Sequence, residues 1–94
     1  MRLDQFLRAS RLVLRRTVAQ ELCEAGAVAV NGQAARSSRA VRAGDEIAVT
    51  RRARRLSVRV LSIPHNRHPA KHDAPGLYEV LADERTSDPE ASGA

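Results

Sequence analysis

Aromatic residues are scarce in this sequence, which contains one Phe, one Tyr and no Trp among 94 residues. A chain of this length can form one small domain but not two, and its core must be built from Leu, Val, Ile and Ala. Proteins that bind unpaired bases use aromatic side chains as stacking platforms. The composition therefore argues against a binder of single-stranded nucleic acid.

Cysteine and long apolar runs are scarce as well. Cys23 is the only cysteine and can form no disulfide within the chain. No charged leader followed by an apolar run precedes the domain, and no segment approaches the roughly 18 consecutive apolar residues of a membrane-spanning helix. From these features we expect a cytoplasmic protein with no membrane partner.

Sequence motifs for catalysis are missing too. The chain has no P-loop, no dinucleotide-binding glycine pattern and no nucleophile elbow. His65, His68 and His72 lie in a Pro-rich segment without companion cysteines, so their spacing does not favour a zinc site. We therefore predict no enzymatic activity, no catalytic residue, no cofactor and no metal.

Positive charge is what the sequence has in excess, and nearly all of it is arginine. Residues 1–60 contain 13 Arg and 5 acidic residues, a net charge of +8, whereas residues 61–94 contain 3 Lys or Arg and 6 acidic residues, a net charge of −3. Arginine binds phosphates and base edges through two parallel hydrogen bonds. A basic domain followed by an acidic segment predicts a polyanionic partner such as RNA, the alternative being a merely solvated charged surface.

The first 25 residues have helical spacing. Leu3, Phe6 and Leu7 predict a short amphipathic helix over residues 2–10. A second helix is expected from near Arg15 to a stop at Gly26, with an apolar stripe and, on roughly the opposite face, polar residues that can meet a ligand. The predicted stripe consists of Val18, Leu22 and Ala25, and the predicted opposite face carries Arg16 and Gln20.

The short first helix leaves one alternative open. Asp4 and Arg8 are four residues apart, so they can form a surface ion pair worth a few tenths of a kcal/mol. Contact of Arg8 with RNA is an equally good interpretation.

After Gly26 the spacing changes to the two-residue repeat of strands. Strands are expected at 27–30, 33–35, 47–49 and 56–63, the last of these being the longest. We assign turn roles to Gly26, Asn31, Gly32 and Gly44, because glycine and asparagine tolerate positive φ. Between the last two strands, Arg51, Arg52, Arg54 and Arg55 form a basic hairpin tip, for which RNA binding and simple solvation are both open.

The ordered combination of these segments resembles the RNA-binding domain named after ribosomal small-subunit protein four. The resemblance covers residues 1–60 and rests on Arg2–Leu7, Arg15–Thr17, Ala19, Gly26, Val30–Gly32 and Gly44–Glu46. Within that superfamily the sequence is most similar to the RqcP group of small bacterial ribosome quality-control factors, with heat-shock protein fifteen as a near relative.

The resemblance implies an α+β domain over residues 1–63, with N-terminal helices packed on a small, mainly antiparallel sheet. The composition of the remainder predicts a mobile Pro/His-rich loop at 64–76, a candidate final strand at 77–81 and a disordered acidic tail at 82–94.

The resemblance also implies a function and a set of contact residues. Such factors bind large-subunit rRNA and peptidyl-tRNA on obstructed large ribosomal subunits, as monomers, with a partner that recruits alanyl-tRNA to extend the stalled chain. The alternatives are a heat-shock-protein-fifteen-like recycling or subunit-assembly factor, an RNA-docking module for a modifying enzyme, and a protein-interaction domain. The RNA-contact residues implied by the resemblance are Arg2, Arg11, Arg15, Arg16, Gln20, Arg36, Ser38 and Arg39.

Overall fold

The computed structural model describes residues 1–64 and 76–85, which form two helices and one five-stranded sheet. The predicted α+β class is confirmed. The elements in chain order are α1 (Leu3–Ala9), α2 (Arg16–Glu24), β1 (Val28–Val30), β2 (Gln33–Ala34), β3 (Glu46–Arg51), β4 (Arg54–Val60) and β5 (Tyr78–Arg85).

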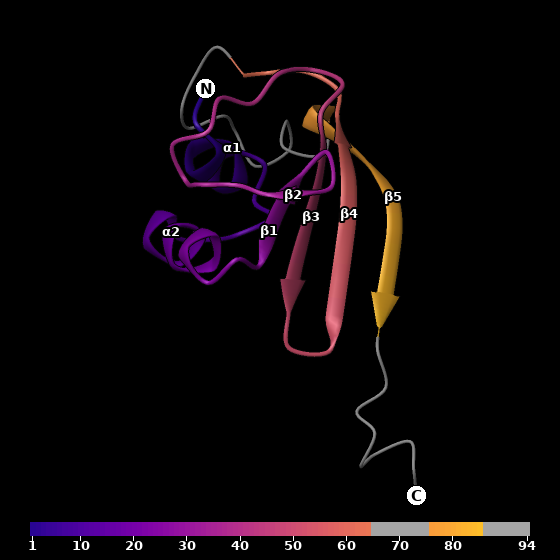
Figure 1. The fold of residues 1–94 in the computed structure, drawn as a ribbon. Helices are drawn as coiled ribbons and strands as arrows, with labels where there is room; N and C mark the ends of the chain where they lie inside the picture. The colour runs from indigo at the N-terminus through magenta and orange to yellow at the C-terminus, as the bar shows by residue number, and fades with distance from the viewer. Residues whose placement is uncertain (65–75, 86–94) are drawn as a thin grey trace, which may run out of the picture.

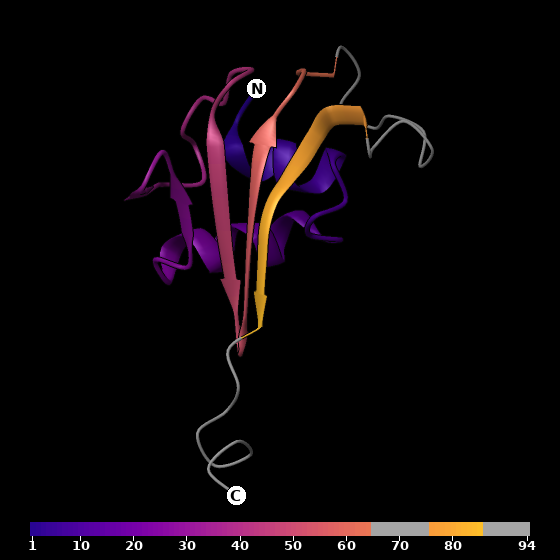
Figure 2. The ribbon, with the colours of Figure 1, turned by 90° about the vertical axis from the view of Figure 1, so that its right-hand side faces the viewer.

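The sheet has the strand order β2-β1-β3-β4-β5, and every neighbouring pair is antiparallel. Both helices cover the same face of the sheet, as Figure 1 shows from the side. Figure 2 shows the opposite face, over which no described helix lies. The β3–β4 hairpin and the end of β5 extend past the helices, so the sheet projects beyond the helical layer (Figure 1).

The core lies between the helices and the covered face of the sheet. Phe6, Leu3 and Leu7 are fully buried on α1, and Val13, in the segment that joins the two helices, is buried in the same core. The strands contribute alternate residues, as a half-buried sheet requires. Their buried side chains are Val28, Val30, Ile47, Val49, Val58 and Val60.

Helix α2 ends in a Schellman motif at Gly26. The Gly26 N–H donates to the carbonyl of Cys23 (3.0 Å), and the Ala27 N–H donates to that of Leu22 (2.9 Å). Gly26 has φ = +74°, a conformation that a residue with a Cβ atom adopts only with strain. The strand β1 therefore leaves the helix in a fixed direction.

Asn31 and Gly32 form the turn between β1 and β2, with φ values of +53° and +85°, as in a type I′ hairpin. Asn31 also ties this turn to β3. Its Oδ1 accepts a hydrogen bond from the Glu46 N–H (2.9 Å), and its Nδ2 donates to Asp45 (3.2 Å). Gly44, with φ = +94°, forms the turn that leads into β3.

Two expectations about the strands need correction. The longest strand is β5, with eight residues, and not β4, with seven. Residues 82–85, expected in a disordered tail, continue β5 because they pair with residues 54–57 of β4. The three histidines and residues 86–94 lie outside the described residues.

The expected apolar stripe of α2 is also displaced. The buried residues are Ala19 and Cys23, while Val18 and Leu22 are partly buried and Ala25 is exposed. Small side chains at Ala19 and Cys23 allow close packing of α2, and the two larger residues cover one flank. The helix is therefore rotated relative to the orientation that the largest apolar residues suggested.

Candidate nucleic-acid interface

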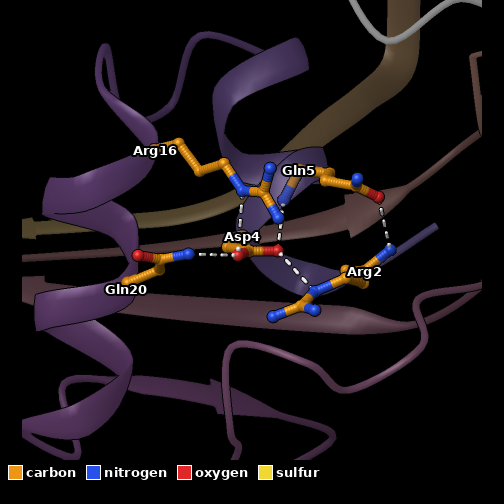
Figure 3. A network of polar contacts seen from close by, with 5 residues as sticks. All are labelled: Arg2, Asp4, Gln5, Arg16 and Gln20. Carbon is orange, nitrogen blue, oxygen red and sulfur yellow. Dashed lines mark hydrogen bonds and ion pairs between the residues drawn. The ribbon is translucent and has the colours of Figure 1, made fainter.

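One buried carboxylate organises the polar residues between the two helices. Asp4 lies in the first turn of α1, and its side chain is 0% exposed. Its Oδ2 accepts hydrogen bonds from Arg16 Nε (3.2 Å) and Gln20 Nε2 (3.0 Å) on α2. Its Oδ1 accepts from Arg2 Nε (3.2 Å) and from the N–H of Gln5 (2.8 Å). Figure 3 shows these side chains converging on Asp4.

The charge on Asp4 is stabilised by these partners. Burial by itself raises the pKa of Asp4, but hydrogen bonds from Gln20 and Arg16 and the positive charges of Arg16 and Arg2 lower it, and the net pKa is below the usual value. The carboxylate is therefore ionised at neutral pH. A buried charge of this kind needs its partners, because an unpaired carboxylate in the core is costly.

Asp4 holds three of the predicted RNA-contact residues in fixed positions. The side chains of Arg2 and Arg16 remain 44% and 47% exposed, so each guanidinium binds Asp4 through Nε and still reaches the surface. Gln20 is held by the same carboxylate. Two basic side chains from different elements are thus oriented before any ligand arrives, which lowers the entropy cost of binding.

The structure changes two expectations about this region. Arg16 and Gln20 were expected opposite the packed stripe of α2, on a face left for a ligand, but both contact Asp4 of α1, so this face also takes part in packing the two helices. Asp4 also does not form a surface pair with Arg8, since it is buried and its ion pairs are with Arg2 and Arg16.

The basic loop at 36–39 is attached to the start of α1. The N–H groups of Leu3 and Asp4 donate to the carbonyls of Arg39 (2.8 Å) and Ser37 (3.1 Å). Arg2 also pairs with Ala40 in an isolated antiparallel bridge. The loop therefore satisfies amides that the first turn of a helix leaves free. It places the exposed Arg39 beside the start of α1, while Arg36 and Ser38, also exposed, line a cavity with Cys23 and Glu24 at the C-terminal end of α2.

Arg11 and Arg15 lie where the two helices meet. Arg11 follows the end of α1 with φ = +61°, and its Nε is buried without a hydrogen-bond partner among the described residues. Arg15 is the N-cap of α2 and is exposed, and its side chain makes no capping hydrogen bond. The first amides of α2 therefore lack a side-chain cap, and Arg15 lies directly beside them.

The described part of the chain has neither a candidate metal site nor a candidate membrane-spanning helix. Within residues 1–64 and 76–85, no three His, Cys, Asp or Glu side chains come together where they could hold a metal ion. No helix in those same ranges is both long and apolar enough to cross a membrane.

Comparison with known proteins assigns the chain to a family. Residues 1–47 match the model of the S4 domain. The RQC P-site tRNA stabilizing factor of Halalkalibacterium halodurans is 39% identical over 87 residues, which is 93% of this chain and 97% of that protein. The chain belongs to this S4-domain family. The factor of the same name from Bacillus subtilis is 36% identical over 85 residues, covering 90% of this chain and 96% of its own length.

A solved structure agrees with the assignment. The trimeric structure of Vibrio cholerae Heat Shock Protein 15 matches with a TM-score of 0.78 at 32% identity, over 87% of this chain and 82% of that chain. The S4-domain match contains α1, α2 and the loop at 36–39, and it ends at the start of β3. The Asp4 cluster therefore lies inside the S4 domain, while the β3–β4 hairpin lies almost entirely outside the matched residues.

The residue missed by sequence reasoning is Asp4. Within the S4 domain it acts as the organiser of Arg2, Arg16 and Gln20, although the sequence alone suggested only a surface pair. One signal was available: Asp4 is the only acidic residue among the first 20, which contain five arginines. A lone carboxylate among that many cations indicates a shared ion-pair partner.

Proposed function

We propose that this chain is a ribosome-associated RNA-binding factor that binds rRNA and peptidyl-tRNA together on obstructed large ribosomal subunits. There it supports ribosome quality control, in which a partner recruits alanyl-tRNA and the stalled chain is extended with alanine. It acts in the cytoplasm by binding rRNA and holding the peptidyl-tRNA in place, and it has no enzymatic activity of its own. The name of its relatives, RQC P-site tRNA stabilizing factor, supports the tRNA part of the proposal.

The observation that carries the proposal is the orientation of Arg2 and Arg16 by the buried Asp4. A phosphate backbone supplies most of the affinity of an RNA-binding protein, and arginine binds phosphate through two N–H groups at once. An arginine that is already held by Nε loses little side-chain entropy when its remaining N–H groups meet a phosphate. Double-stranded RNA is recognised mainly by its backbone and 2′-hydroxyls, so this surface suits structured RNA.

Two groups of residues would contact two RNA backbones. Arg11, Arg15 and Arg16 lie at the junction of the helices, beside the uncapped amides of α2, whose positive dipole end favours an anion. Arg36, Ser38 and Arg39 lie on the loop that is fixed to the start of α1. Arg2 lies next to this loop and shares Asp4 with Arg16. We propose that the first group contacts one RNA and the loop contacts the other.

Affinity purification of the tagged chain from cells, followed by sequencing of the bound RNA, tests the proposal. The RNA that co-purifies should contain large-subunit rRNA and tRNA, with little small-subunit rRNA. Arg16→Gln and Arg39→Gln should each reduce recovery of both RNAs, because two weak backbone contacts act together. Arg42→Gln, which removes an exposed arginine outside both groups, is the charge-matched control. Recovery of RNA unchanged by Arg16→Gln and Arg39→Gln would contradict the assignment of the site.

The structural likeness to Heat Shock Protein 15 supports one alternative within the same class, a recycling or subunit-assembly factor. The two roles differ in whether peptidyl-tRNA is part of the binding site. Equal recovery with empty and with obstructed subunits would favour the alternative.

A further inference from the structure

Three arginines form a row across the projecting end of the sheet. In the strand register, Arg51 of β3 lies directly opposite Arg54 of β4, and Arg54 lies directly opposite Arg85 of β5. All three therefore lie on one face of the sheet. Arg51 continues the alternation of Ile47 and Val49, so this is the face that the helices cover further along. These residues stand at the end of β3, the start of β4 and the end of β5, and Figure 1 shows that this end of the three strands extends beyond α2.

Such a row is unfavourable in isolation. Like charges directly opposite each other on neighbouring strands repel. Asp83 accepts hydrogen bonds of 2.9 Å from Nε and from Nη2 of the central Arg54, and the charge of Arg85 also helps to lower the pKa of Asp83. In residues 1–64 and 76–85, neither Arg51 nor Arg85 forms an ion pair, and both are exposed. The row thus holds a fixed central guanidinium between two arginines that can bind an anion.

The turn at the end of the hairpin contains a fourth arginine, Arg52, in a strained backbone conformation. Arg52 has φ = +52°, a left-handed conformation that strains a residue with a Cβ atom and that Gly or Asn adopts more easily. The next residue, Ala53, and the rest of the turn present no large apolar side chain. Protein–protein interfaces usually have an apolar centre, which this tip lacks, so its chemistry fits a phosphate backbone better than a protein.

We propose that the projecting tip, defined as Arg51, Arg52, Arg54 and Arg85, is a second phosphate-binding surface that contacts an RNA backbone apart from the Asp4 cluster. The inference rests on the proposed function, in that the chain must bind RNA. It adds a site outside the part of the chain that matches the S4 domain. Arg51 and Arg85 bind phosphate oxygens, Asp83 positions Arg54 between them, and Arg52 extends the contact past the end of the sheet.

The salt dependence of binding tests this surface. The double variant Arg51→Gln/Arg85→Gln removes two charges and leaves the Arg54–Asp83 pair intact. Arg42→Gln/Arg59→Gln removes two exposed arginines elsewhere and is the charge-matched control. Binding to purified large ribosomal subunits and to a fluorescent RNA hairpin is measured over a range of salt concentrations. Thermal unfolding of each variant checks that the domain is folded.

The tip variant should reduce the slope of log affinity against log salt by about 0.9 for each lost phosphate contact, which is about 1.8 for both. The control should change the slope much less. Equal slopes for the tip variant and the control would overturn the proposal. Arg16→Gln in the same assay separates the two claims: if it weakens binding while the tip variant does not, only the second surface fails, and if neither has an effect, the proposed function fails.

A positional experiment identifies what the tip contacts. An iron chelate attached to the thiol of the A53C variant generates hydroxyl radicals at the tip, and wild type is the control because its only cysteine, Cys23, is buried. Cleavage of rRNA or tRNA around one position, absent with wild type, is the expected result. Absence of RNA cleavage from subunit-bound protein would overturn the proposal, as would damage to a bound acidic protein alone.

Discussion

The Nε atom of Arg16 lies 3.2 Å from Oδ2 of Asp4, a residue twelve positions earlier in the chain and fully buried. One carboxylate therefore links α1 to α2 and fixes an arginine at the surface. The stability of the domain and the proposed RNA binding should therefore both depend on this pair, and the predictions below test the two in turn.

Removing the charge of Asp4 should destabilise the fold. Asp4→Asn keeps the shape of the side chain, but its amide group cannot accept from Arg2, Arg16, Gln20 and the Gln5 N–H as the carboxylate does. Breaking a buried ion pair costs about 3–5 kcal/mol, and because both arginines are nearly half exposed we expect about 2–3 kcal/mol. Urea unfolding measures the change. Asp83→Asn, which removes an exposed pair, is the control and should leave the midpoint nearly unchanged.

The same pair predicts how stability depends on acid. Partners in the folded state hold the pKa of Asp4 below its usual value. Its contribution is therefore complete above the unfolded pKa of about 3.9 and is lost as pH falls through the lower folded value. Wild type should lose stability below about pH 4 more steeply than Asp4→Asn. Urea unfolding of both proteins from pH 7 down to about pH 2 measures this, and parallel stability curves below about pH 4 would contradict it.

Gly26→Val should destabilise the domain by about 1 kcal/mol or more. A Cβ atom at this position would meet no other atom within 4 Å, so the cost comes from the backbone at φ = +74° and not from a clash. Gly26→Asn is the matched control and should cost less, because asparagine tolerates the left-handed conformation. Thermal unfolding compares the three proteins, and equal losses in the two variants would show that φ is not the cause.

RNA binding should be more sensitive to Arg16 than to Arg55. Arg16 is held at the helix junction by Asp4, whereas Arg55 lies opposite Thr50 and Glu84, on the face of the sheet away from the helices. Arg16→Gln should therefore weaken binding to large subunits several-fold more than Arg55→Gln, which removes the same charge. Filter binding at moderate salt measures the difference. Equal losses would mean that net charge, and not the Asp4 cluster, determines affinity.

Local signals in the sequence were sufficient for much of the fold. Gly26 and the Asn31–Gly32 turn were predictable because a positive φ requires particular residue types, and the alternation at Ile47 and Val49 specified which side chains are buried. The end of β5 was not predictable, because residues 82–85 are polar and become a strand only by pairing with β4.

The candidate site was less predictable because, like the end of β5, it depends on contacts between segments that are far apart in the sequence. The arginines were visible in the sequence, but what orients them is a contact between Asp4 and two residues of another helix. The rotation of α2 follows from small residues, Ala19 and Cys23, which carry a weaker hydrophobic signal than Val18 and Leu22. Both features depend on how two helices pack, and no local pattern specifies that.

Co-sedimentation with defined ribosomal particles tests the central claim most directly. Purified protein is mixed with large subunits carrying peptidyl-tRNA, with empty large subunits and with intact translating ribosomes. We predict strong retention on the obstructed subunits, weak retention on empty ones and almost none on intact ribosomes, with retention lost when the helix-junction arginines or the loop arginines are reversed in charge. Equal retention on empty and obstructed subunits would contradict the account.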